Sequence, residues 1–420
     1  MKNIIFHVDV NSAFLSWEAT YRLHHKGGTL DIRTVPSAVG GDMSMRHGII
    51  LAKSIPAKKY CITTGETILE AKRKCPNLLL VPPNYGMYEQ CSKAFMGILK
   101  EYSDNVEQYS IDEAFVDMSE TCHLFGNPVE TANQIKDRVR NELGFTVNIG
   151  ISSNKLLAKM ASDFEKPDKV HTLYPEEMEE KMWTLPVSDL FFVGRATTKK
   201  LLNLGIMTIG ELAKTDPVWL KTVFKKQGEI VWNFANGIDF SPVVSVAPPN
   251  KGYGNSTTTP YDVVDEVTAR KVLLALSETV GSRLRKDHVE IELVSVGIRY
   301  SDLSYFSHQK RLKTSTDLTM EIYNAACELF VALWNGYPIR HLGVHTGKVQ
   351  DCDFSRQMVL FDDTDYEKLS KVDDTIDVIR KRFGNDAVKR AVFANQPIDH
   401  MSGGISREKR SVDYSKIVVD

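Results

Sequence analysis

The chain contains 420 residues, of which 42% are hydrophobic and 25% are charged, and its formal net charge is −2. A globular domain averages about 150 residues, so this length predicts roughly three domains, and the composition excludes a largely disordered chain. The nearly neutral balance excludes binding to nucleic acid through overall charge. Any affinity for DNA must therefore come from local groups of lysine and arginine.

The apolar start of the chain is interrupted at His7 and Asp9, too early for a signal peptide, and no later apolar stretch is long enough to span a membrane. The six cysteines form no Cys-x-x-Cys pair and have no histidines nearby at zinc spacing. Such cysteines are typical of free thiols in a reducing compartment. We therefore expect a cytoplasmic protein that makes no contact with membranes.

Strand and helix patterns alternate through the first 167 residues. Apolar, β-branched residues predict buried strands at 4–10 and 145–151, and residues 105–118 are typical of a strand, a turn and a second strand. Apolar periodicity, glycines and prolines predict helices at 13–24, 66–75, 85–102, 128–143 and 154–164. This alternation indicates an α/β sheet unit.

The second part of the chain begins with a helical region, 188–236, in which Thr208 and Asp216 are predicted N-caps. Residues 241–252, rich in proline, are the best candidate for an interdomain linker. After it, the patterns predict strand 253–259, helix 265–286, strands 290–300 and 304–314, helix 318–335 and strand 339–348. This β-α-β-β-α-β order indicates a small split-βαβ domain, and one more helix is predicted at 365–383.

Three acidic residues are notable for their positions. Asp9 lies near the end of the first predicted strand, and Asp112 and Glu113 lie in the predicted hairpin. Strands of one sheet can bring such distant residues together, and carboxylate oxygens are the ligands that Mg²⁺ prefers. Paired metal ions of this kind supply the charge neutralisation that phosphoryl transfer requires.

Asp112 and Glu113 raise a geometric difficulty. Adjacent residues of a regular strand point to opposite faces, so these two share a metal site only if a turn or a bulge redirects one of them. Taken alone, an acidic pair of this kind is more often a polar turn that binds no metal. The residues around the pair decide between the two interpretations.

Both acidic sites lie within longer motifs, Val8-Asp9-Val10-Asn11-Ser12-Ala13-Phe14 and Tyr109-Ser110-Ile111-Asp112-Glu113-Ala114-Phe115. These resemble the two catalytic signatures of the Y-family of lesion-bypass DNA polymerases, the group that includes DNA polymerase IV and UmuC-like proteins of bacteria. Shorter matches follow in the family order at 57–60, 70–72, 75–77, 150–152, 154–155, 158–159 and 166–167. Chance agreement of that many ordered motifs is very rare, so the resemblance is specific.

The resemblance implies a template-directed DNA polymerase that uses primer-template DNA, deoxynucleoside triphosphates and two Mg²⁺ ions, for which Mn²⁺ can substitute. Asp9, Asp112 and Glu113 correspond to the metal ligands, and the backbone carbonyl of Val10 adds another. Phe14 corresponds to the steric gate, a ring that excludes the 2′-OH of a ribonucleotide. Without the motif, Phe14 would be interpreted as a core aromatic residue.

The triphosphate site departs in part from the family pattern. Lys166 corresponds to the lysine that contacts the incoming nucleotide. Lys58 stands where the family has an arginine, and it supplies the charge without the bidentate fork. Ile55 replaces a tyrosine and its hydroxyl, a loss for which Arg46 is the candidate substitute. Asn11 replaces a second aspartate of many relatives and is not counted as a ligand.

Two further regions correspond to DNA-contacting parts of the family. Residues 190–202 resemble a helix-hairpin-helix, whose backbone amides bind a DNA phosphate, although Phe192 replaces the first hairpin glycine. The predicted contacts there are Gly194, Arg195, Ala196 and Lys199. Beyond the linker, Arg299 and Arg311 are predicted to contact the DNA backbone. The alternatives are a helical hairpin without a ligand and a solvated sheet face.

The implied architecture is a multidomain right hand built from α/β and α+β parts, and we expect it to act as a monomer. Its predicted parts are a palm (1–20 and 78–167), fingers (21–77), a helical thumb (168–240), the linker (241–252), a βαββαβ little finger (253–349) and a C-terminal tail (350–420).

The tail contains a short motif, Gln357-Met358-Val359-Leu360-Phe361. It resembles the peptide with which bacterial polymerases bind the sliding clamp. The amide of Gln357 fits a small polar pocket, and Leu360 and Phe361 fit an adjacent apolar groove. The alternative is a last strand or turn that packs on the domain at 253–349.

The resemblance implies low-fidelity translesion synthesis in DNA repair or damage tolerance. Two other functions compete with it. A nucleotidyl cyclase is disfavoured by the thumb-like hairpin and by the split-βαβ domain. A catalytically impaired DNA-binding accessory protein of the same fold is disfavoured by the intact acidic residues and Lys166, whereas Ile55 favours it.

Overall fold

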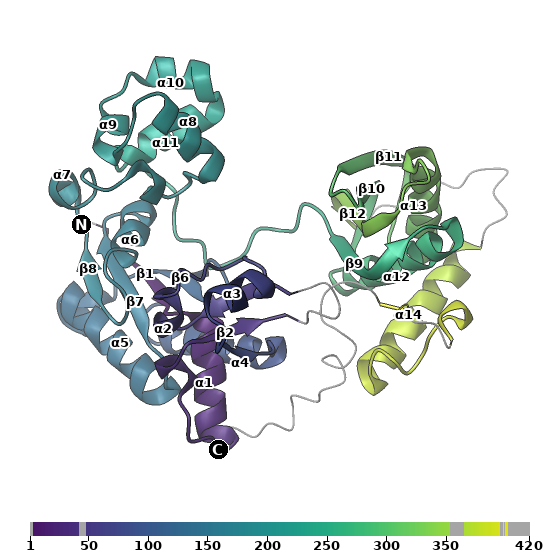
Figure 1. The fold of residues 1–420 in the computed structure, drawn as a ribbon, viewed down its shortest axis with the longest axis horizontal. Coiled ribbons are helices and arrows are strands. Elements are labelled where there is room, and N and C mark those ends of the chain that lie inside the picture. Colours follow the sequence, from purple (N-terminus) through teal and green to yellow (C-terminus); the bar gives the residue numbers. More distant parts are fainter. Residues whose placement is uncertain (1–2, 42–47, 353–364, 395–397, 399, 402–420) are drawn as a thin grey trace. The chain divides into compact units, whose positions relative to one another are not determined.

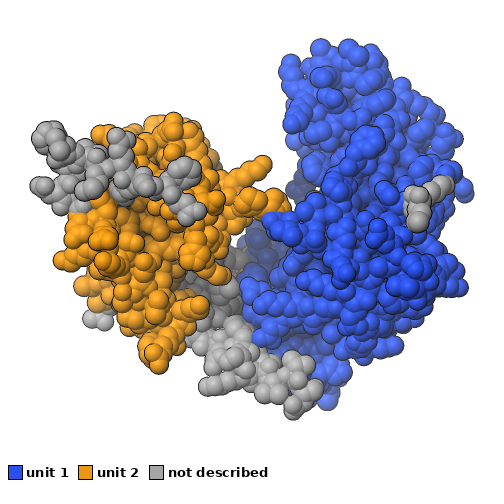
Figure 2. Space-filling view, turned by 180° about the vertical axis from the view of Figure 1, so that it is seen from behind, with its two compact units in different colours: residues 1–40, 49–247 blue, residues 41–48, 248–420 orange. Residues whose placement is uncertain are grey.

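The computed structural model describes residues 3–41, 48–352, 365–394, 398 and 400–401 (Figure 1). The chain forms two compact units, one of residues 1–40 and 49–247 and one of residues 41–48 and 248–420 (Figure 2).

The first unit is built on a five-stranded sheet in the order β5-β6-β1-β7-β8. Its strands are β1 (Ile5–Val10), β5 (Val106–Gln108), β6 (Glu113–Asp117), β7 (Val147–Ser152) and β8 (Val170–Thr172). The central strand β1 runs antiparallel to both neighbours, β6 and β7. The predicted strands and the hairpin are therefore confirmed, and β8 adds an edge strand that the sequence patterns did not predict.

One face of this sheet is apolar and carries the main core. Phe6, Val8 and Val10 of β1 are buried there against α4 (Tyr85–Lys100) and α5 (Pro128–Leu143). The helix α5 has the bounds predicted from the sequence, because local signals mark both ends. A capping box of Asn127 and Glu130 begins it, and Gly144, at φ 73°, ends it.

The opposite face of the sheet is polar and is covered by α6 (Lys155–Ser162) (Figure 1). Gly150 of β7 makes this close packing feasible. A Cβ atom at Gly150 would lie 2.0 Å from the carbonyl oxygen of Ala158, so only glycine fits there. The helix consequently lies directly over the strands that carry the acidic residues.

A second, three-stranded sheet forms the predicted fingers region. The strands β2 (Ser37–Gly40), β3 (Ile50–Lys53) and β4 (Leu79–Val81) pair in the order β3-β2-β4, and they pack with α1 (Ala13–His25), α2 (Ile55–Lys58) and α3 (Ile68–Lys74). The sequence patterns predicted α1 and α3 but neither α2 nor this sheet. Strands of three or four residues are too short to establish a period.

Small helices make up the predicted thumb. They are α7 (Met178–Lys181), α8 (Arg195–Asn203), α9 (Ile209–Ala213), α10 (Pro217–Phe224) and α11 (Lys226–Ala235), with short 3₁₀ turns at Pro175–Glu177 and Val187–Asp189. Thr208 and Asp216 cap α9 and α10 as predicted.

The predicted linker is not free along its whole length. Val243 is buried with Ile5, Phe115 and Ala158 of the palm. The backbone N–H of Val244 donates to the Glu107 carboxylate at 2.9 Å. The first residues of the segment 241–252 therefore lie on the palm.

The second unit contains a four-stranded antiparallel sheet in the order β11-β10-β12-β9. Its elements are β9 (Gly254–Val263), α12 (Glu266–Lys286), β10 (Val289–Tyr300), β11 (Tyr305–Thr316), α13 (Thr319–Leu333) and β12 (Ile339–Asp351). The strand β12 lies between β9 and β10, so the predicted split-βαβ arrangement is confirmed. The helices α12 and α13 supply its core together with the sheet.

Ion pairs join α12 to the last helix, α14 (Tyr366–Phe383), and to Arg390, which follows it in the chain. Glu278 of α12 is 2% exposed and contacts Arg380 and Arg390, each at 2.7 Å. Arg285 contacts Asp373 at 3.2 Å and the neighbouring Asp377 at 2.7 Å. Buried charges of this kind are stable only when paired, so α14 is an integral layer of the second unit.

Candidate active site and DNA-binding surfaces

Two of the three predicted carboxylates are brought together by the pairing of β1 with β6. Asp9 lies directly opposite Glu113 in this ladder, so both side chains project from the polar face of the sheet. Asp9 is buried, with 8% of its surface exposed, and Glu113 is half-buried. The sheet register therefore creates an acidic pair at one end of β1.

Asp112 lies in the turn just before β6, outside the regular strand. Its carbonyl accepts a hydrogen bond from the Val10 N–H at 3.0 Å, and its carboxylate accepts one from the Ser110 hydroxyl at 2.7 Å. The alternation of a regular strand therefore does not apply to Asp112 and Glu113. A turn of this kind is what Asp112 and Glu113 need if their side chains are to face the same metal site.

Two lysines contact the acidic pair from the polar face. The Lys166 ammonium contacts Asp9 and also Asp163, the latter at 2.8 Å. Lys159 of α6 lies 3.1 Å from Glu113. The sequence resemblance predicted Lys166 at the triphosphate, and it included Lys159 among the family matches without assigning it a role.

Burial controls the electrostatics of the site. It raises the pKa of Asp9 to about 6, against the opposing effect of the Lys166 ammonium. Burial alone would also raise the pKa of Glu113, but the nearby His7 ring and the Lys159 ammonium oppose this effect and lower the pKa. A further cation beside Asp9 would stabilise its charged form.

The donor chemistry fits a divalent metal ion, since three carboxylates offer the oxygen ligands that Mg²⁺ prefers. In the parts of the chain that the structure describes, no three His, Cys, Asp or Glu side chains lie together as a ready metal-binding group. Asp9 and Glu113 are adjacent, and Asp112 is tied to them through the backbone of Val10.

His7 is a buried polar residue that the sequence reasoning did not assign to the site. It lies two residues before Asp9 and therefore on the same face of β1. Its Nδ1 atom lies 2.7 Å from the Ser162 hydroxyl, and its Nε2 atom lies 3.5 Å from Glu113, too far for a well-formed hydrogen bond. The available signal in the sequence was a histidine between two apolar residues, Phe6 and Val8, of a strand predicted to be buried.

Phe14 lies in the first turn of α1, shortly after Asp9 in the chain. Its half-buried ring stacks on Tyr88, with 4.6 Å between ring centroids and 10° between ring planes, and it meets Tyr85 edge-on. Asn11 holds the connection to β1, because its N–H donates to the Thr146 carbonyl at 3.0 Å. The gate candidate is therefore held by both packing and backbone hydrogen bonds.

The fingers place the remaining nucleotide candidates on the short helix α2. Ser54 caps this helix through a hydrogen bond from the Ala57 N–H, and Lys58 is its last residue. Lys58 and Ile55 are both exposed. Arg46, the candidate substitute for the family tyrosine, lies outside the described residues.

Comparison with known proteins identifies the family. The impB/mucB/samB family model matches residues 8–163, its C-terminal domain matches residues 250–360, and the IMS family HHH motif matches residues 175–206. DNA polymerase IV of Clostridium acetobutylicum is 47% identical over 395 residues, which cover 94% of this chain and 98% of that protein. DNA polymerase IV of Acetivibrio thermocellus is 40% identical, with coverage of 94% and 98%.

This chain belongs to the impB/mucB/samB family. A solved Y-family DNA polymerase chimera shares its fold, with a TM-score of 0.70 at 22% identity over 83% of this chain and 99% of the chimera. The Y-family resemblance and the right-hand fold class are thereby confirmed. Among the described helices, none has the length and apolar character needed to cross a membrane.

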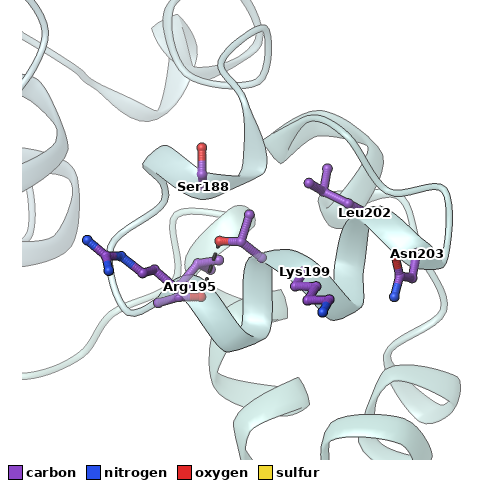
Figure 3. A pocket seen from close by; sticks show the side chains of 8 residues that line it. Ser188, Arg195, Lys199, Leu202 and Asn203 are labelled. Atoms are coloured by element: carbon purple, nitrogen blue, oxygen red, sulfur yellow. Dashed lines mark hydrogen bonds between the residues drawn. The ribbon is translucent and has the colours of Figure 1, made fainter. Parts of the chain in front are cut away.

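The HHH motif of the impB/mucB/samB family falls on the hairpin that leads into α8. An open pocket of about 520 Å³ lies here, lined by Ser188, Val193, Gly194, Arg195, Thr198, Lys199, Leu202 and Asn203 (Figure 3). The pocket lining includes three of the four hairpin residues predicted to contact DNA, and the fourth, Ala196, lies in the first turn of α8. None of the three carboxylates lines this pocket.

At Phe192 the hairpin departs from the family pattern in sequence, but its backbone there has a conformation typical of glycine. Its φ is 71°, the left-handed conformation that glycine adopts most readily, so the backbone keeps the shape of a glycine turn. The ring packs edge-on against Phe191 and Phe234, at 4.7 and 5.6 Å between centroids. Aromatic packing therefore supports a conformation that is otherwise unfavourable for phenylalanine.

The C-terminal domain of the family corresponds to the second unit, where β11 is an exposed edge strand. Arg299 of β10 lies over the Tyr305 ring, 5.7 Å from its centroid. Arg311 is exposed and contacts Glu292 at 2.8 Å. Both predicted DNA contacts thus belong to the paired strands β10 and β11. Gln357, Leu360 and Phe361 lie outside the described residues.

Proposed function

We propose that this chain is a DNA-directed DNA polymerase that extends a primer on a template and tolerates damaged template bases with low fidelity. The acidic pair of Asp9 and Glu113, beside Asp112, carries the proposal, because it occurs in a family whose relatives are named DNA polymerase IV. We also propose that the enzyme acts as a monomer in the cytoplasm, on the DNA found there.

Asp9, Asp112, Glu113 and the carbonyl of Val10 would hold two Mg²⁺ or Mn²⁺ ions, which supply charge neutralisation at the attacking and leaving oxygens. Lys166 already lies beside Asp9, so its ammonium can meet the triphosphate next to the same carboxylate. Lys58 adds a second positive charge from the fingers. These residues bind and orient the nucleotide, and proximity of this kind accounts for much of the catalysis.

Primer extension in the presence of Mg²⁺, on undamaged templates and on templates with one damaged base, tests this proposal directly. Extension that follows the template sequence is the expected result. A nucleotidyl cyclase would instead convert a nucleoside triphosphate in the absence of DNA. An accessory protein of the same fold would bind primer-template DNA and extend nothing.

The thumb pocket is the proposed contact for a DNA phosphate. We expect Lys199→Ala to weaken DNA binding equally on all sequences and to reduce the slope of log affinity against log salt by about 1. Lys221→Ala is the matched control, since Lys221 is paired with Glu229 at 2.9 Å and does not line the pocket. Fluorescence anisotropy at several salt concentrations measures both slopes. An unchanged slope for Lys199→Ala would refute the contact.

The proposed partner is a sliding clamp, bound through Gln357, Leu360 and Phe361. A linked binding site raises the effective concentration of the polymerase at the primer end. We expect Leu360→Ala/Phe361→Ala to abolish stimulation by the clamp on long primed DNA while clamp-free extension stays normal.

The control for the clamp experiment is Val378→Ala/Phe383→Ala, which removes two exposed apolar residues of α14, 65% and 67% exposed. This variant should respond to the clamp like the wild type. Equal stimulation of all three proteins would exclude the peptide as the binding site. Loss of clamp-free activity in the Leu360→Ala/Phe361→Ala protein would indicate that the segment packs on its own domain.

A further inference from the structure

The helix α6 presents two lysines, one turn apart, to the hairpin of β5 and β6. Lys155 contacts Glu107 at 2.6 Å, and Lys159 contacts Glu113 at 3.1 Å. The two lysine side chains are similarly buried, with 13% and 10% of their surfaces exposed. Only the second lysine contacts a carboxylate of the acidic site.

The position of Lys159 depends on the close packing of α6. Gly150 leaves no Cβ atom between β7 and the helix, so the backbone of α6 lies directly on the sheet. Lys159 must then project along the sheet surface toward β6. Its other neighbours are Asp163, at 3.7 Å, and the ring of Phe191, whose centroid is 5.9 Å from the ammonium. A lysine buried this far requires a carboxylate partner.

Glu113 has little else to fix its carboxylate. Its backbone is held by the ladder with β1, but the flexible side chain has several rotamers available. Lys159 contacts the Oε1 atom, whereas His7 lies 3.5 Å from Oε2 and is itself engaged with Ser162 at 2.7 Å. Lys159 is therefore the closest described group that restricts the orientation of Glu113.

We propose that Lys159 is a positioning residue of the polymerase, which holds the Glu113 carboxylate in one orientation through its Oε1 atom. The proposal rests on the proposed function, in which Glu113 is a metal ligand. Groups that orient a metal-binding carboxylate typically contribute about 10- to 100-fold to metal affinity or activity. Lys159 acts through Glu113 and needs no contact with DNA or nucleotide.

The test compares Lys159→Met, which removes the ammonium and keeps an unbranched side chain, with Lys159→Arg, which keeps the charge. Lys155→Met is the matched control, because it breaks an equivalent ion pair on the same helix. For each protein, kcat and KM for one correct nucleotide are measured, together with Mn²⁺ binding to the protein–DNA complex by electron paramagnetic resonance. The melting temperature of each protein, from thermal unfolding, measures the loss of stability that both methionine substitutions should cause.

We expect Lys159→Met to lower kcat and to weaken Mn²⁺ binding, each by about 10- to 100-fold, with little change in the KM for the nucleotide. Lys159→Arg should keep most of the wild-type kcat and most of the wild-type affinity for Mn²⁺. Lys155→Met should keep the kcat and Mn²⁺ affinity of the wild type, even though its melting temperature falls to a similar extent.

The direction in which Mn²⁺ affinity changes in Lys159→Met distinguishes a residue that positions Glu113 from one that only neutralises its charge. If Lys159 were only a counter-ion, its removal would leave Mn²⁺ binding unchanged or make it tighter, and either result would overturn the proposal. Equal loss of kcat in Lys159→Met and Lys155→Met would also overturn it, because general destabilisation would then explain both. A wild-type protein that extends no primer would instead refute the proposed function itself.

Discussion

Asp9→Ala and Asp112→Ala should each abolish primer extension and leave primer-template binding close to that of the wild type. Asp9 is a buried acid at the end of the central strand, and Asp112 is joined to it through the backbone of Val10. Removing one group that stabilises charge in a transition state typically lowers the rate by about 10²- to 10³-fold, and loss of a metal ligand should exceed this range. Single-nucleotide insertion and anisotropy with labelled DNA measure the two effects.

Asp117→Ala is the matched control for this experiment. Asp117 lies at the far end of β6, opposite Ile5, and its carboxylate accepts hydrogen bonds from Ser119. Its removal should lower stability slightly and keep polymerase activity. Normal extension by Asp112→Ala would contradict the assignment of two metal ions to this site.

Phe14→Ala should keep the use of deoxynucleotides and raise the incorporation of ribonucleotides on the order of a hundredfold, the scale at which a shape-based pocket discriminates one additional group. The ring of Phe14 is stacked on Tyr88 and cannot easily move away from a 2′-OH. The measurement is the ratio of kcat/KM for matched deoxy- and ribonucleoside triphosphates.

Phe95→Leu controls for loss of packing, because Phe95 is fully buried in the core cluster against which Phe14 packs. This substitution should lower the melting temperature with no change in sugar selectivity. If Phe14→Ala behaves like Phe95→Leu, with lower stability and unchanged selectivity, Phe14 is a core residue and not a steric gate.

The elements that the sequence predicted well have strong local signals. The helix α5 is bounded by Asn127 and Gly144, and the long strands of the second unit carry many alternating residues. The fingers sheet was missed because its strands contain only three or four residues. Val243 is one of three valines in a segment rich in proline, and nothing in this pattern distinguished it as the residue that packs on the palm.

The acidic residues and Lys166 were predicted from motifs, but the groups that contact Glu113 were not. Asp9, Asp112 and Glu113 stand in recognisable signatures, whereas the role of Lys159 depends on a contact across the sheet. That contact exists because Gly150 admits α6, and no pattern within either segment indicates it. Long-range packing of this kind has no signature in a single sequence.

The ion pairs that α12 makes with α14 and with Arg390 limit where this protein can be shortened. A chain that ended before Gln357, so as to remove the proposed clamp-binding residues, would also remove Arg380 and Arg390 and leave Glu278 without its two arginine partners. The helix α12, which forms part of the little-finger core, would then expose a charged surface that is normally covered. Loss of activity after such a truncation would reflect damage to the second unit as much as loss of the proposed partner. Deletion mapping of the C-terminus is therefore unsuitable, and point substitutions are required.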